Sequence, residues 1–189
     1  KNDKGKFQAS FLKGGEEHFG LWNRIEILDL NDDGKPDILA GNTGKNFKWT
    51  PSKDSPVYLY IDDFDKNEQS DPIIFYKYFD KYRPFNTKDN LASQMPIIKK
   101  RFNKYKDFSK VNSIKKLIGK KEKNILEIKK LTELRSMAYI NKGDNFESSL
   151  LPIEAQLSSI QDFLWDEDPN EIYYIGNSEE FVTELGNQN

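Results

Sequence analysis

A nine-residue acidic loop occurs twice in this chain, and its residue types are those that bind a hard divalent cation. The copies span residues 29–37 and 63–71, and each carries Asp or Asn at loop positions 1, 3, 5 and 9. Ca²⁺ takes about 6–8 oxygen ligands, and such an odd-spaced set with a carbonyl at position 7 supplies most of them. The predicted side-chain ligands are Asp29, Asn31, Asp33, Asp37, Asp63, Asp65, Asn67 and Asp71, and Lys35 and Gln69 are predicted to offer their carbonyl oxygens.

The segments around both loops predict β-strands. Short β-branched and aromatic runs at residues 25–28, 38–42, 57–61 and 73–76 enter and leave the loops, and such runs between polar turns are typical of strands. A helix–loop–helix calcium site would need an acidic residue at position 12, where this chain has Ala40 and Ile74. Each motif is therefore predicted to be a β-hairpin with a metal at its tip.

The alternative is that these residues only make turns, because Asp, Asn and Gly tolerate tight backbone conformations. Two copies in the same strand context favour the metal interpretation. In the second copy, Glu68 stands where the first has Gly34. If this position needs a positive φ, Glu68 is strained.

The pattern of strand, D-x-[DN]-x-[DN]-G-x-x-D, strand and Gly-Asn resembles the FG-GAP/VCBS repeats of β-propellers. It is most similar to the bacterial VCBS-repeat proteins related to the ASPIC/UnbV type. The matching stretches are residues 28–42, 56–76, 141–156 and 176–177. The resemblance implies propeller blades, Ca²⁺ as cofactor and the eight side-chain ligands named above. It also identifies residues 164–171 as a blade tip that has lost its metal, because Leu164 and Pro169 replace the first acidic residue and the glycine.

The expected fold is mainly β with an α-helical insertion and about three propeller-like blades. A blade takes about 40–50 residues, so a chain of 189 residues is too short for a closed ring of blades, and we expect either a fragment of a larger propeller or an open array. Residues 1–86 are predicted to form blades with two cation loops and residues 134–189 a further blade with a degenerate loop. Residues 87–133 are predicted to be a basic insertion of three or four short helices, with Thr87 as an N-cap.

Charge is distributed unevenly along the chain. Residues 97–130 hold thirteen basic and three acidic residues, a net charge of +10, whereas the remainder has a net charge of −12. This stretch is interpreted either as a surface for an anionic polysaccharide, lipid headgroup or nucleic acid, or as a solvated helical face. Nucleic acid is not the expected partner, because Phe102, Tyr105 and Phe108 are interpreted as core residues rather than stacking platforms.

The composition excludes several kinds of chemistry. The chain has no cysteine and a single histidine, His18, which is expected to be exposed in a turn. Disulfides and histidine-based triads are therefore excluded or improbable. No apolar run is long enough to span a membrane. No catalytic constellation is found.

These observations predict a calcium-stabilised, extracytoplasmic module that binds a protein or glycan at the cell surface. Millimolar calcium outside the cell would keep weak sites filled. The alternative is a polysaccharide-active enzyme or its accessory domain, with a carboxylate pair flanked by Trp22 or Trp49.

Overall fold

The computed structural model describes residues 2–8, 12–165 and 171–176 of the chain. Its contacts divide the chain into two compact units. The first, called here the two-segment unit, comprises Lys1–Thr50 and Glu133–Asn189, and the second, called the central unit, comprises Pro51–Thr132. The central unit therefore interrupts the sequence of the first.

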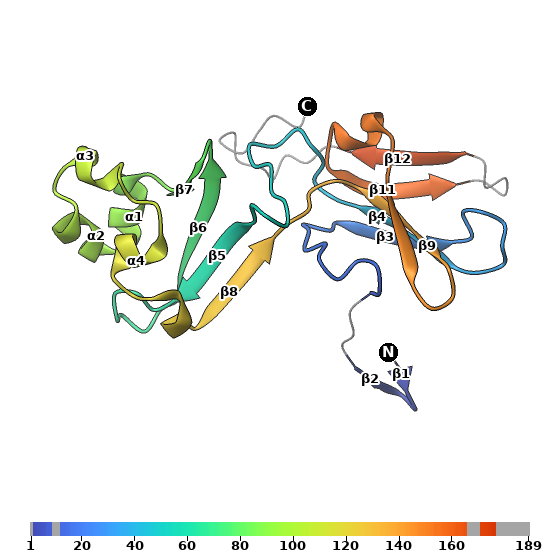
Figure 1. The fold of residues 1–189 in the computed structure, drawn as a ribbon, viewed down its shortest axis with the longest axis horizontal. Coiled ribbons are helices and arrows are strands. Elements are labelled where there is room, and N and C mark those ends of the chain that lie inside the picture. The colour runs from blue at the N-terminus through green and yellow to red at the C-terminus, as the bar shows by residue number, and fades with distance from the viewer. Residues whose placement is uncertain (1, 9–11, 166–170, 177–189) are drawn as a thin grey trace. The chain divides into compact units, whose positions relative to one another are not determined.

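The two-segment unit is built on a four-stranded antiparallel sheet in the order β10–β9–β4–β3 (Figure 1). Its strands are β3 (Arg24–Leu28), β4 (Asp37–Gly41), β9 (Met137–Asn141) and β10 (Phe146–Leu150). Two hairpins that are distant in sequence meet where Leu39 of β4 pairs with Ala138 of β9. Because both strands bury apolar side chains, this pairing lies in the core of the unit.

Two further hairpins and a 3₁₀ helix complete this unit. The hairpins are β1 (Asn2–Asp3) with β2 (Lys6–Phe7), and β11 (Ile160–Trp165) with β12 (Ile172–Gly176); the helix is η2 (Ile153–Gln156). Ile160 and Phe163 of β11 pack with Leu39 and Ala138 of the main sheet. The β11–β12 hairpin is thereby attached through apolar contacts.

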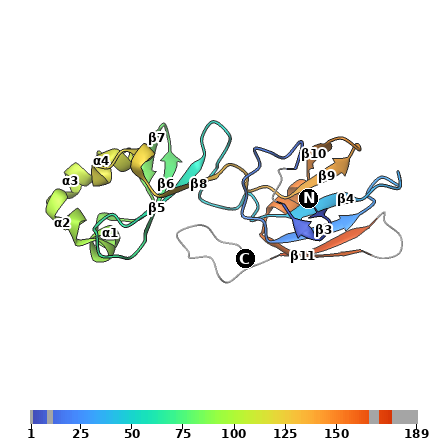
Figure 2. The same cartoon turned by 90° about the horizontal axis from the view of Figure 1, so that it is seen from below.

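The central unit combines a second four-stranded antiparallel sheet with short helices. The sheet order is β7–β6–β5–β8, with β5 (Val57–Asp62), β6 (Asp71–Tyr78), β7 (Lys81–Pro84) and β8 (Glu127–Leu131). The helices are α1 (Lys88–Gln94), α2 (Pro96–Arg101), α3 (Tyr105–Phe108), α4 (Ile114–Ile118) and η1 (Glu122–Asn124). Figure 2 shows α1 to α4 gathered at one side of this sheet.

The core of the central unit lies between its sheet and its helices. Ile73 and Phe75 of β6 pack with fully buried residues of α1, α2 and α4 and with the residue between α1 and α2, namely Leu91, Met95, Ile98, Ile114 and Leu117. Local signals set the helix limits. Thr87 caps α1 by accepting the N–H of Asn90 at 3.2 Å, Pro96 is the first residue of α2, and Gly119 ends α4 with a φ of 91°, a conformation that glycine adopts without strain.

The structure confirms a mainly β fold with antiparallel sheets and both predicted loop hairpins. Four short helices occupy most of the predicted insertion, and Thr87 is the predicted cap. The prediction of helix as far as Glu133 is wrong, because residues 127–131 form β8 and pair with β5. Within the described residues the sheets close into neither a barrel nor a propeller, so the blades remain a prediction. No helix in the described part of the chain is long and apolar enough to cross a membrane.

Candidate metal centre

The two acidic loops have the same backbone conformation. Loop position 4 has a positive φ in both, at Asp32 (57°) and Lys66 (64°). Position 6 does as well, at Gly34 (78°) and Glu68 (68°). The strain predicted for Glu68 is therefore present in the structure, because an L-residue in the left-handed region costs energy that glycine avoids.

The two loops also share their side-chain hydrogen bonds. The first carboxylate accepts the N–H groups of the fifth and sixth residues, at 3.1 and 2.7 Å for Asp29 and at 3.0 and 2.9 Å for Asp63. The last carboxylate accepts the N–H of the second residue, at 2.9 Å for Asp37 and 3.0 Å for Asp71. Both loops are thus closed by the same contacts, and these explain why position 1 and position 9 are Asp.

Position 5 makes the third shared contact. Its side-chain oxygen accepts the N–H of the seventh residue, at 2.9 Å for Asp33 and 2.8 Å for Asn67. This bond from the Lys35 backbone, together with the Lys35 ammonium, lowers the pKa of Asp33 below its ordinary value. An N–H that donates to a carboxylate stabilises its charged form.

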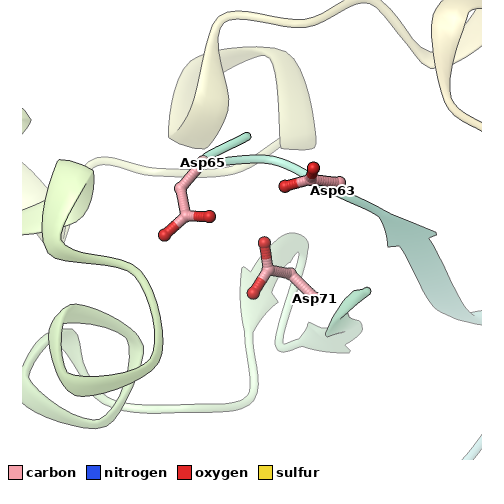
Figure 3. A group of neighbouring side chains, drawn as sticks. All are labelled: Asp63, Asp65 and Asp71. Atoms are coloured by element: carbon pink, nitrogen blue, oxygen red, sulfur yellow. The ribbon is translucent and has the colours of Figure 1, made fainter. Parts of the chain in front are cut away.

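The second loop brings three carboxylates together. One oxygen from each of Asp63, Asp65 and Asp71 lies within 4.8 Å of the other two, and the three side chains point toward one another (Figure 3). They are the only such group of three acidic, histidine or cysteine side chains in the described residues. Three negative charges this close repel one another unless a cation lies between them.

One oxygen of this group has no partner. Oδ1 of Asp65 is buried and has no hydrogen bond within the described part of the chain. Leaving a buried acceptor unsatisfied costs about 1–3 kcal/mol, and more when it is charged. A cation would give this oxygen a ligand bond, so the residues present fit a metal.

The chemistry of the donors indicates the kind of metal. All predicted ligands are oxygen atoms, which suit Ca²⁺, Mg²⁺ or Mn²⁺ rather than the softer metals that prefer thiolate or imidazole. Asn67 and the carbonyl of Gln69 would add to the three carboxylates, and they remain predicted ligands.

The first loop does not gather three carboxylates. Asp37 is completely buried, and its two oxygens accept the N–H groups of Leu30 at 2.9 Å and Asn141 at 2.6 Å. The Lys35 ammonium lies 3.3 Å from Asp33 and partly neutralises it. Asn31 stands at position 3, where the second loop has Asp65, and bonds within the loop. Each loop has three Asp among its predicted ligands, but among the described residues only those of the second loop lie close together.

The structure adds a residue that the sequence did not indicate as part of the site. The Gln94 side chain, at the end of α1, donates from Nε2 to Oδ1 of Asp71 at 3.3 Å. This contact joins the second loop to the helices of the central unit. Gln94 belongs to the stretch from Leu91 to Pro96, whose helix-then-proline pattern predicts a helix end but not this contact.

The predicted third loop falls largely outside the described residues, since positions 166–170 are not described. Leu164 and Trp165 end β11, and the structure does not address the loss of a metal there.

The tryptophans proposed for the alternative enzyme are not arranged as a sugar platform. Trp49 is buried, and Trp22 packs edge-on against Tyr139.

His18 is half-buried rather than exposed as predicted. Its Nδ1 lies 3.0 Å from the Tyr139 hydroxyl. Burial raises the pKa of Tyr139 to about 12.

A different tryptophan lies beside charged side chains. Trp165 is 41 % exposed and lines a shallow pocket with Glu26 and Asp162. Arg24 forms an ion pair with each of these two carboxylates. Nothing in the local sequence predicted this group, because strands from the two ends of the chain contribute to it.

Comparison with known proteins finds no protein-family model, curated protein or solved structure that matches this chain.

Proposed function

We propose that this protein is a calcium-stabilised, propeller-type binding or scaffolding module that acts outside the cytoplasm and recognises a protein or glycan partner at the cell surface. The observation that carries the metal part is the group formed by Asp63, Asp65 and Asp71 with a buried, unpartnered oxygen. Support for propeller-type blades comes from the two four-stranded antiparallel sheets, since four strands are the usual number in a blade.

The role proposed for the metal is structural. A cation between the three carboxylates would neutralise their repulsion and fix the tip of the β5–β6 hairpin. Because Asp71 also accepts a hydrogen bond from Gln94, ordering this carboxylate would order the end of α1. The first loop is proposed as a second site, with Asn at position 3 and Asp at position 5, the reverse of the second loop.

Exposed apolar and aromatic side chains support the binding role. The edge strand β3 exposes Ile25 and Ile27 at 57 % and 64 %, and the edge strand β12 exposes Tyr173 and Ile175 at 57 % and 54 %. Large apolar side chains grouped on a surface are typical of protein interaction sites. Trp165 lies beside the charged group around Arg24, and an exposed aromatic ring next to polar groups suits a sugar. A glycan is therefore the other candidate partner.

Thermal unfolding with calcium, with magnesium and with EDTA tests the metal role. Calcium at about 100 times its dissociation constant stabilises the folded state by about 2.7 kcal/mol. In a domain of about 60–100 residues, a stabilisation of this size raises Tm by roughly 10–20 °C. We expect such a rise for the unmodified chain and little or none for Asp65→Ala.

Asp80→Ala is the matched control, because Asp80 is an exposed Asp of the same unit outside both loops. It should keep the full response to calcium. A Tm that is the same in calcium and in EDTA for the unmodified chain would contradict the proposal.

A further inference from the structure

The helices of the central unit carry a dense, exposed set of cations that the metal loops do not use. The exposed basic residues between Lys99 and Lys123, on α2, α3 and α4 and the segments that join and follow them, are called here the basic surface. Its members are Lys99, Lys100, Arg101, Lys104, Lys106, Lys110, Lys115, Lys116, Lys121 and Lys123. Between residues 97 and 123 the acidic residues are Asp107 and Glu122 alone.

Most of these cations have no acidic partner among the residues that the structure describes. Lys110 pairs with Asp107, and Glu122 accepts a hydrogen bond from Tyr60. Across residues 2–8, 12–165 and 171–176, no ion pair involves the lysines at positions 99, 100, 104, 106, 115, 116, 121 and 123. A concentration of unpaired positive charge creates a potential that attracts polyanions.

Contacts between the helices bring parts of the basic surface together. Arg101, at the end of α2, donates to the carbonyl of Ile118 at the end of α4. Lys120 pairs with Asp62, and the N–H of Leu126 donates to the same carboxylate. These two contacts hold the segment after α4 against the end of β5.

The structure does not have the features of a nucleic-acid reader. The four helices contain only four to seven residues each, too short to read bases along a major groove. Phe102 is buried as predicted. Tyr105 is 61 % exposed, so its prediction as a core residue is wrong, but the Lys88 ammonium lies over its ring at 4.7 Å. Lysine greatly outnumbers arginine on the basic surface. This composition suits non-specific attraction of negative charge rather than the bidentate hydrogen bonds that arginine makes to phosphates and bases.

Exposed apolar side chains occur in the same segments of the chain as these lysines. Leu126, which follows Lys121 and Lys123 in the chain, is 78 % exposed, and Ile97, 39 % exposed, lies three and four residues before Lys100 and Arg101 in α2 and so shares a helix face with them. A soluble polyanion gains nothing from such side chains. An anionic lipid bilayer interacts favourably with both kinds of side chain. Lysines attract its headgroups, and apolar side chains insert at the boundary between headgroups and acyl chains.

We propose that the basic surface docks the central unit on a bilayer that contains anionic phospholipid. Each lysine close to such a bilayer contributes about 1 kcal/mol, so four to eight lysines hold the protein without a transmembrane segment. This inference uses none of the metal ligands, and its failure would leave the calcium proposal untouched.

Co-sedimentation with lipid vesicles tests the proposal, with calcium held constant in every sample. The unmodified chain should bind vesicles containing phosphatidylglycerol and should not bind vesicles of phosphatidylcholine alone. Replacing Lys99, Lys100, Lys115 and Lys116 by Gln should weaken binding to the anionic vesicles at least about 100-fold. As the matched control, the exposed residues Lys4, Lys6, Lys13 and Lys45 of the two-segment unit, also replaced by Gln, should leave binding within about threefold.

A second variant separates lipid from a soluble polyanion. Leu126→Gln should weaken binding to anionic vesicles about five- to tenfold, because one leucine no longer leaves water, and should not change binding to dextran sulfate. Equal binding of the quadruple lysine variant and the unmodified chain would overturn the proposal. Binding to dextran sulfate or to DNA without binding to anionic vesicles would also overturn it, and would assign the basic surface to that polyanion.

Discussion

At the scale of single residues, the Asp side chains of the two acidic loops have two different roles: some close the loop through hydrogen bonds, and one is explained better as a metal ligand. Asp29 and Asp63 accept backbone N–H groups of their own loop and are explained by loop closure alone. Asp65 is not, because its buried oxygen accepts no hydrogen bond in the described residues. The choice of Asp at position 3 of the second loop is thus the strongest residue-level argument for a cation.

The sixth position of the loops offers a reciprocal test of backbone strain. Gly34 and Glu68 both have a positive φ, and a Cβ added at Gly34 meets no atom within 4 Å. We expect Gly34→Ala to lower the free energy of unfolding by about 1 kcal/mol, and Glu68→Gly to raise it by about the same amount. Urea unfolding in EDTA measures both without a contribution from metal.

The control for this pair is Asp80→Gly, in an exposed turn outside both loops, where Asp80 does not have a positive φ and no gain is expected. If Glu68→Gly destabilised the protein as much as Gly34→Ala does, the equivalence of the two loops would be wrong.

At the scale of elements, an ion pair between a buried carboxylate and a partly exposed guanidinium fixes the start of the segment that leads into β9. Glu133 is 5 % exposed, accepts the N–H groups of Leu134 and Arg135, and pairs with the Arg135 guanidinium. Burial would raise the pKa of Glu133, but these hydrogen bonds outweigh it and lower the pKa below its ordinary value of 4.5.

Replacing this carboxylate should therefore cost stability in a pH-dependent way. Glu133→Gln should lower the free energy of unfolding at pH 7 by about 1.5–3 kcal/mol, as for other hydrogen bonds to a charged group. Because the folded-state pKa is depressed, the contribution of Glu133 is complete above pH 4.5 and is lost as the pH falls below it. Urea unfolding at pH 7, 5 and 3.5 measures both effects.

The exposed Glu154→Gln serves as the control and should behave like the unmodified chain at all three values. A difference between Glu133→Gln and the unmodified chain that stayed the same at pH 3.5 would show that charge is not the source of the stability.

The sequence predicted the hairpins well and the pairing between them poorly. Strands 25–28, 38–42, 57–61 and 73–76 were recognisable because each is a short apolar run beside a polar loop. Strand β8 was not, because Ile125, Ile128 and Leu131 recur at a spacing that also fits a helix. Only Leu131 among the β8 residues is buried, and β8 pairs with the distant β5, so no local signal marks it as a strand.

At the scale of the whole molecule, the central unit interrupts a unit whose two segments pair with each other. The pairing of β4 with β9 requires the chain to return after the central unit is complete. Sequence patterns indicate elements but carry little information on such long-range pairing. The closeness of Asp63, Asp65 and Asp71 could be predicted because all three lie within one loop. The contact of Gln94 and the group around Arg24 could not, because they depend on contacts between distant segments.

The most direct test of the central claim is the number of calcium ions bound per chain, measured by equilibrium dialysis at increasing calcium concentration. We predict that the unmodified chain binds at least one ion with a dissociation constant on the order of 0.1–1 mM, as in extracellular modules. Asp65→Ala should bind one ion fewer, and Asp80→Ala should bind as many as the unmodified chain. If Asp65→Ala bound the same number of ions with the same affinity, or if the unmodified chain bound none, the group of Asp63, Asp65 and Asp71 would not be a calcium site.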